Sequence, residues 1–309
     1  MKPTFFAPIN TGFTDGGGPD RRLFDFHLAR SGPDIGINYV GNVAIAPKYR
    51  TNPQTAVIDC NVKRWSRLAK GILDCGSAPG VQLGCRVDEI PSARKWFNKD
   101  TENFTAQMRE HISSLSHSDL SCILERFYSS CCRAADSGFR VIQIHAAHGY
   151  FLSALMSDVV NIRTDKFNPF DLYFHLYLIE KIKSNRPEAI LDIRVSLNDG
   201  FFDGQDQNVR DKQIETIANS KVDMISLTSG MYNSNRFLIY PTPKAGHAVY
   251  FPDACQWAKK HPGKMWGVAG NIWDLNRIWP QRPANLYIGA GRKLLANPRF
   301  FEDFFQIRR

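Results

Sequence analysis

Short apolar runs rich in β-branched residues recur along the chain, with helical segments between them. Apolar runs that alternate with helices in this way predict parallel βα units. We expect eight strands, at residues 4–8, 35–46, 80–83, 141–145, 192–196, 224–228, 264–269 and 285–290. Eight parallel strands favour closure into a barrel, because a closed sheet leaves no edge strand unpaired. The pattern therefore predicts an α/β fold, a (β/α)8 TIM barrel.

An open, doubly wound sheet is the alternative, but no GxGxxG turn follows the first strand. No low-complexity linker divides the chain, so a single domain spanning residues 1–309 is expected. The third unit has a long connection, residues 86–105, before its helix. Connections of this length are often lids or substrate-facing loops.

Composition supports a folded enzyme of the reducing interior of a cell. Hydrophobic residues make up 43% of the 309 positions and charged residues 22%, which is enough for a large core. No apolar run is long enough to span a membrane and no signal peptide is visible, so we expect a cytoplasmic protein with no membrane partner. The seven cysteines are scattered and form no CxxC pair, which favours reduced thiols.

The net charge of +9 has two interpretations. It could attract anions such as a phosphorylated cofactor, a CoA-like substrate or nucleic acid. It could equally be a solvated basic surface, and the dispersal of the basic residues favours this second interpretation. We therefore expect no nucleic-acid partner.

The most informative chemistry follows the fourth predicted strand. An apolar run ends in His145 and His148, three residues apart, and Gly149 and Tyr150 come next. Two imidazoles and a phenol at a strand tip form a cluster that can donate hydrogen bonds and protons. A metal site is the alternative, but no third ligand stands at convincing spacing, and catalytic zinc needs three protein ligands. No metal is expected.

Residues 141–166 read VIQIHAAHGYFLSALMSDVVNIRTDK. This segment closely resembles the old yellow enzyme family of FMN-dependent ene-reductases. The resemblance implies that His145 and His148 hold the carbonyl oxygen of the substrate and that Tyr150 protonates the substrate. Arg163 and Asp165, in the same segment, are interpreted as an internal ion pair that holds the loop.

The resemblance also implies a non-covalent FMN site. The backbone of residues 7–9 would lie beside the central flavin ring, and Asn10 would hydrogen-bond the flavin near O4 or serve as a turn residue. Gln82 would pair its amide with the pyrimidine edge of the flavin, since a carboxamide offers both a donor and an acceptor. The full set of implied cofactor contacts is Ala7, Pro8, Ile9, Asn10, Asn42, Gln82, His145, Arg194, Gly270, Asn271, Gly291 and Arg292.

Arg194 is a charge inside an apolar strand and needs a partner. The resemblance places it against flavin N1 and O2, where a guanidinium stabilises the negative charge that reduction brings. A buried salt bridge is the alternative. The glycine-rich turns after the last two strands, with Arg292, are expected to bind the phosphate.

Two features depart from the family pattern. Asn42 stands where a residue such as alanine is usual, and residues 82–86 read QLGCR, a shortened version of the usual continuation that lacks its histidine. The resemblance therefore does not determine the substrate contacts on that side.

The resemblance implies an NAD(P)H-dependent reduction of the C=C bond of an α,β-unsaturated carbonyl compound. Hydride would come from reduced FMN and the proton from Tyr150. A specialised FMN-dependent desaturase, oxidase or redox-neutral isomerase is an alternative. More remote ones are an RNA-modifying flavin barrel and a barrel that has lost FMN, although the retained Gln82, Arg194 and Arg292 argue against such a loss. The oligomeric state that we consider for the chain is a homodimer.

Overall fold

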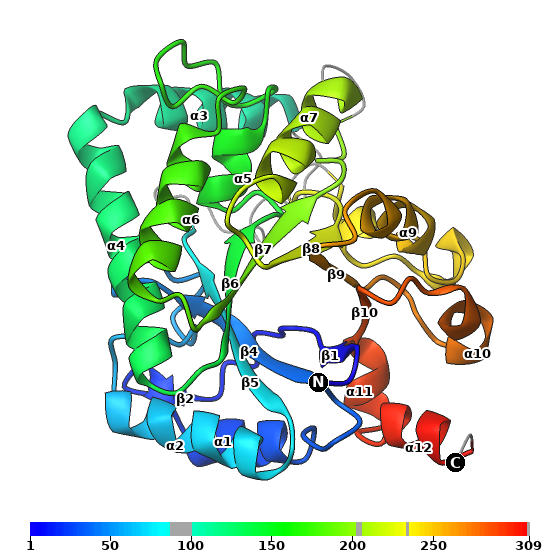
Figure 1. Cartoon of the computed structure of the whole chain (residues 1–309). Helices are drawn as coiled ribbons and strands as arrows, with labels where there is room; N and C mark the ends of the chain where they lie inside the picture. The colour runs from blue at the N-terminus through cyan, green and yellow to red at the C-terminus, as the bar shows by residue number, and fades with distance from the viewer. Residues whose placement is uncertain (87–100, 202–205, 233–234, 308–309) are drawn as a thin grey trace.

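The computed structural model describes residues 1–86, 101–201, 206–232 and 235–307. Within them, eight parallel strands close into one barrel (Figure 1), in the order β1-β10-β9-β8-β7-β6-β5-β4, and β4 pairs with β1 to complete the ring. The strands are β1 (Thr4–Phe6), β4 (Ile37–Ala44), β5 (Ala78–Gly84), β6 (Val141–Ala146), β7 (Ile190–Ser196), β8 (Met224–Thr228), β9 (Met265–Val268) and β10 (Leu286–Ala290). The predicted TIM barrel is confirmed, and the open sheet is excluded because no barrel strand is left with an unpaired edge.

Two strand boundaries differ from the prediction in ways that matter for the site. β1 ends at Phe6, so Ala7 and Pro8 lie just beyond its carboxyl end; proline has no N–H with which to continue the ladder. β7 begins at Ile190, two residues early, so Asp192 is the third residue of the strand and not its first. The limits of the domain, residues 1–309, stay a prediction.

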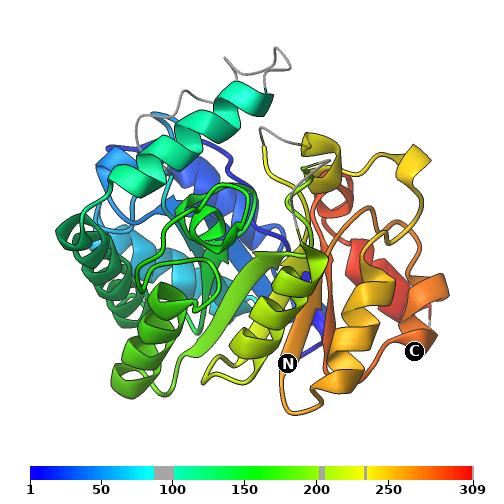
Figure 2. The ribbon, with the colours of Figure 1, turned by 90° about the horizontal axis from the view of Figure 1, so that it is seen from above.

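Helices surround the barrel, as the view from above shows (Figure 2). They are α1 (Arg21–Leu28), α2 (Val62–Asp74), α3 (Thr101–Ser114), α4 (His117–Asp136), α5 (Phe151–Met156), α6 (Tyr173–Asn185), α7 (Gln207–Ala218), α8 (Arg236–Ile239), α9 (Phe251–Lys260), α10 (Leu275–Ile278), α11 (Arg292–Ala296) and α12 (Phe300–Gln306). A short hairpin of β2 (Thr14–Asp15) and β3 (Gly18–Pro19), which the pattern does not predict, precedes α1. α2 shows why such segments are helical: its buried residues are Trp65, Leu68, Ala69 and Ile72, the spacing of one helix face.

The connection at residues 86–105 lies largely outside the described residues. Its described end, from Thr101, already belongs to α3, so the helix begins inside the predicted connection. Whether this connection acts as a lid stays a prediction.

The main apolar core fills the space between the strands and the helices. A smaller cluster lies inside the barrel and consists of Phe5, Ala7, Ile37, Tyr39, Val141 and Met224. Other interior positions of the strands are polar and buried, notably Gln82, Gln143 and Asp192. Across the described ranges, every helix is too short or too polar to cross a membrane.

Candidate active site

The three predicted catalytic side chains meet at the carboxyl end of β6. The His145 ring centroid lies 5.1 Å from that of His148 and 4.3 Å from that of Tyr150. His148 and Gly149 both have positive φ angles, 63° and 80°. This left-handed turn, which glycine adopts at little cost, folds Tyr150 back over His145. The HxxHGY spacing therefore builds one compact cluster.

Both histidines are buried and neutral near pH 7. Burial, reinforced by the nearby Arg194 guanidinium, lowers the pKa of His145 and of His148 well below the usual value. His148 Nε2 lies 2.9 Å from Thr228 Oγ1, whereas His145 Nδ1 is buried without a hydrogen-bond partner among the described residues. Leaving such an atom unpaired costs about 1–3 kcal/mol. A ligand that bonds the ring would remove that cost.

Tyr150 keeps its phenol proton at neutral pH. Burial raises its pKa to about 12. The phenol oxygen lies 2.8 Å from Thr51 Oγ1 and accepts a hydrogen bond from Asn42 Nδ2 at 3.1 Å. Because Asn42 donates to the phenol oxygen, the phenol's own O–H remains to be donated elsewhere.

Asn10 and Asn42, both predicted to contact the cofactor, belong to the network around this phenol. Asn10 Nδ2 donates to Asn42 Oδ1 at 3.3 Å and to Thr55 Oγ1 at 3.0 Å. Its Oδ1 accepts from the Gly12 amide at 3.2 Å, which matches the turn-residue interpretation. Both N–H groups of Asn10 thus already have acceptors, and a bond to flavin O4 stays a prediction. Sequence reasoning missed Thr51 and Thr55, since isolated threonines in a loop carry no signal.

Gln82 and Arg194, both predicted to contact the cofactor, each donate one side-chain hydrogen bond to a neighbouring strand. Gln82 Nε2 donates to Gln143 Oε1 at 2.6 Å, which leaves the carbonyl oxygen and one N–H of Gln82 for other partners. Arg194 Nη2 donates to Thr228 Oγ1 at 3.3 Å. Within the described part of the chain no carboxylate forms an ion pair with Arg194, so the salt-bridge alternative is wrong there.

The residues predicted to bind phosphate also gather at one place. Arg292, exposed at the start of α11, donates from Nη2 to Asn271 Oδ1 at 3.3 Å. Gly291 faces the segment after β1, because a Cβ there would lie 3.8 Å from both Ala7 Cβ and Ile9 Cδ1. The first and last strands thus bring the two ends of the predicted cofactor site together.

These groups fit FMN chemically. A carboxamide with a free carbonyl oxygen and N–H suits the donor-acceptor edge of the ring, a guanidinium suits its reduced, negatively charged side, and a basic residue beside glycine turns suits a phosphate. His145 Nδ1 adds a buried ring nitrogen that needs a partner. Across the described residues no group of three His, Cys, Asp or Glu side chains could hold a metal ion.

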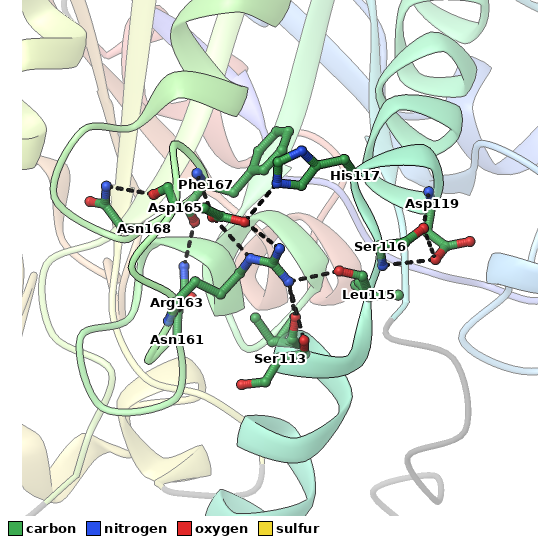
Figure 3. Close-up of polar contacts among 11 residues, drawn as sticks. Ser113, Leu115, Ser116, His117, Asp119, Asn161, Arg163, Asp165, Phe167 and Asn168 are labelled. Carbon is green, nitrogen blue, oxygen red and sulfur yellow. Dashed lines mark hydrogen bonds and ion pairs between the residues drawn. The ribbon is translucent and has the colours of Figure 1, made fainter.

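The predicted ion pair of Arg163 and Asp165 is confirmed (Figure 3): Arg163 Nη2 lies 2.5 Å from Asp165 Oδ2. Arg163 Nη1 also donates to the carbonyl oxygens of Ile112 at 2.9 Å and Leu115 at 2.8 Å, which joins this loop to the end of α3. The Arg163 guanidinium lowers the pKa of Asp165 below its usual value, and His117 adds a second bond to that carboxylate. The pair is structural and lies outside the catalytic cluster.

Comparison with known proteins finds relatives that match most of the chain. Residues 9–307 match the family model of the NADH:flavin oxidoreductase / NADH oxidase family. The NADPH dehydrogenase of Bacillus subtilis (strain 168) is 27% identical over 293 residues, covering 91% of this chain and 84% of that protein. The NADPH dehydrogenase of Geobacillus thermodenitrificans (strain NG80-2) is 25% identical over 284 residues, covering 87% and 79%.

Solved structures show the same fold. Old Yellow Enzyme from Pichia sp. AKU4542 superposes with a TM-score of 0.73 at 14% identity, covering 97% of this chain and 83% of that one. A 2-naphthoyl-CoA reductase in complex with 2-naphthoyl-CoA gives 0.80 at 12% identity. That alignment covers 98% of this chain but 49% of the reductase, so the chain spans about half of its length. At these identities the likeness concerns the fold alone.

Proposed function

The chain belongs to the NADH:flavin oxidoreductase / NADH oxidase family, that of the old yellow enzymes, and is an FMN-dependent oxidoreductase that uses NAD(P)H; from this premise we propose that it reduces the C=C bond of an α,β-unsaturated carbonyl compound. One observation carries the proposal. At the carboxyl end of β6, the ring centroid of the neutral His145 lies 5.1 Å from that of the neutral His148 and 4.3 Å from that of the protonated Tyr150.

The two histidines would bind the substrate through its carbonyl oxygen. A neutral imidazole offers one N–H, so His145 and His148 together can donate two hydrogen bonds. These bonds strengthen as negative charge develops on the oxygen, and the surrounding burial excludes the water that would weaken them. When bound, FMN would accept a hydride from NAD(P)H and then supply a hydride to the β-carbon of the substrate.

Tyr150 would deliver the proton to the α-carbon. Asn42 and Thr51 hold the phenol oxygen by hydrogen bonds of 3.1 and 2.8 Å. The Asn42 amide can then stabilise the phenolate that forms when the proton leaves. Thr51 is only partly buried, so the phenol has a neighbouring hydroxyl near solvent from which a proton can return.

We assign the cofactor-binding roles as part of the same proposal. Gln82 would meet the pyrimidine edge and Arg194 the N1 and O2 side, with the backbone of Ala7, Pro8 and Ile9 beside the ring. Gly270, Asn271, Gly291 and Arg292 would hold the phosphate.

The homodimer and the cytoplasmic location stay predictions. Size-exclusion chromatography with light scattering tests the homodimer.

Tyr150→Phe separates the two half-reactions. Measured anaerobically by stopped flow, reoxidation of the reduced flavin by 2-cyclohexenone should slow about a hundredfold, because general-acid catalysis is lost. Reduction of the flavin by NADPH should stay within about twofold of wild type, because that step needs no proton from Tyr150. Tyr173→Phe, a change on the distant α6, is the matched control and should alter neither rate.

Equal loss of both half-reactions would contradict the role of Tyr150. A wild-type flavin that NADPH reduces but enones do not reoxidise would overturn the proposed substrate class. It would direct the search to a desaturase, oxidase or redox-neutral isomerase, which product analysis with and without NADPH distinguishes.

A further inference from the structure

A row of polar side chains crosses the interior of the barrel. In the strand register Gln82 on β5 pairs with Gln143 on β6, and Gln143 pairs with Asp192 on β7. The three residues are 3%, 1% and 0% exposed. Polar groups buried to this extent need hydrogen-bond partners, and here a chain of bonds runs along the row.

The hydrogen bonds of this row have a fixed direction that starts at Asp192. An ionised carboxylate only accepts hydrogen bonds. Asp192 Oδ2 accepts from Gln143 Nε2 at 2.5 Å, so the amide nitrogen of Gln143 must face Asp192. Gln143 Oε1 then faces the other way and accepts from Gln82 Nε2 at 2.6 Å. Gln82 is therefore left with its carbonyl oxygen and one N–H to offer a ligand.

We propose that Asp192 is a positioning residue for the cofactor: through Gln143 it fixes which way round Gln82 presents its amide to the pyrimidine edge of the flavin. The inference rests on the cofactor site proposed above. The edge of the flavin carries an N–H between two carbonyl oxygens, so it needs an acceptor flanked by a donor. The reversed amide would set N–H against N–H.

The surroundings of Asp192 support a role beyond packing. Tyr39 and Ser226 donate to the same Oδ2 at 2.6 and 2.8 Å, whereas Oδ1 is buried without a partner among the described residues. Burial raises the pKa of this carboxyl to about 6, opposed by those donors and by the Arg194 guanidinium. At neutral pH the group is mostly ionised, so it accepts from Gln143 and does not donate to it. A buried charge at this position lowers the stability of the fold compared with an apolar residue of similar size.

Asp192→Leu and Gln143→Leu test the relay, because each breaks it at a different link. We expect each to weaken FMN binding to the apoprotein about five- to tenfold, the loss of one well-oriented hydrogen bond, measured by flavin fluorescence quenching. The 15N resonance of N3 in bound, labelled FMN should move toward its value in water. Because the two residues act in series, the double variant should bind FMN no more weakly than either single variant.

Two further variants separate the relay from general damage to the barrel. Tyr39→Phe removes a donor from the same Asp192 oxygen, but Tyr39 lies outside the row. This variant should bind FMN within about twofold of wild type and should leave the N3 resonance unshifted. Asp192→Asn keeps an oxygen that can accept from Gln143, and should restore most of the affinity lost in Asp192→Leu.

Additive losses in the double variant, an unchanged N3 resonance in Gln143→Leu, or an equal loss in Tyr39→Phe would each overturn the relay. A wild-type chain that binds no FMN would instead overturn the cofactor site itself. The two failures are therefore distinguishable.

Discussion

Two polar clusters arise from the same short segment of sequence, and their hydrogen bonds differ. At one end of residues 141–166, His145 keeps a buried ring nitrogen without a partner among the described residues. At the other end, Arg163 distributes its N–H groups over Asp165 and over backbone carbonyls at and just beyond the end of α3. The first cluster has bonding capacity left for a ligand and the second has little. Of these two clusters, the one with unused hydrogen-bonding capacity is therefore the candidate for ligand binding, and the saturated one is structural.

The largest expected effect comes from His145→Phe, which removes both ring nitrogens and keeps an aromatic ring. At saturating FMN, reoxidation by 2-cyclohexenone should slow about a hundredfold, the usual result of losing one oxyanion-stabilising donor. The free energy of unfolding, measured by denaturant titration, should change by less than about 1 kcal/mol. A large stability loss with an unchanged rate would reverse the assignment of the two clusters.

Arg163→Ala should show the opposite pattern. It removes a guanidinium whose side chain is 9% exposed and which joins Asp165 to the end of α3. The free energy of unfolding should fall by roughly 2 kcal/mol, because an ion pair and buried backbone carbonyls lose their donor. Both half-reactions of the folded protein should keep wild-type rates. Arg299→Ala, whose ion pair with Glu302 is exposed, is the control and should change stability little.

The smallest effect is a difference in pH dependence. The pKa of His145 is lowered in the folded chain, so below about pH 6.5 the unfolded chain takes up a proton that the folded chain excludes. Stability should therefore fall as the pH drops below 6.5, by about 1.4 kcal/mol per pH unit for this group. His27 and His175, whose pKa values burial lowers to about 4, add to the same window. The measured quantity is thus the difference between wild type and His145→Phe.

Asp165 should act in a more acidic window. Its pKa is lowered by Arg163, so its stabilising contribution is fully present above about pH 4 and is lost as the pH falls further. Asp165→Asn should remove this second, acidic fall and leave the first. Denaturant titrations between pH 3 and 8 resolve the two windows, and a single shared window would contradict the separation of the clusters.

The sequence by itself determined the barrel and the position of the chemistry. The repeat of apolar runs and helices gives the order of the strands, and side chains after the carboxyl ends of parallel strands must meet at one end of a barrel. The HxxHGY spacing predicted that His145, His148 and Tyr150 lie together, because contacts within a few residues depend on local geometry. The Arg163–Asp165 pair, two residues apart, was predictable for the same reason.

Only the tertiary structure decided which distant side chains complete the site. Asn42 meets Tyr150 across 108 residues of chain, and Gln143 meets Asp192 across 49. The signal that identified Arg194, a polar residue in an apolar strand, also marks Gln143 and Asp192. It does not say that both side chains point inward or that their amides and carboxylate align in one row. Those facts depend on strand register and on barrel closure, which bring together residues that no local pattern connects.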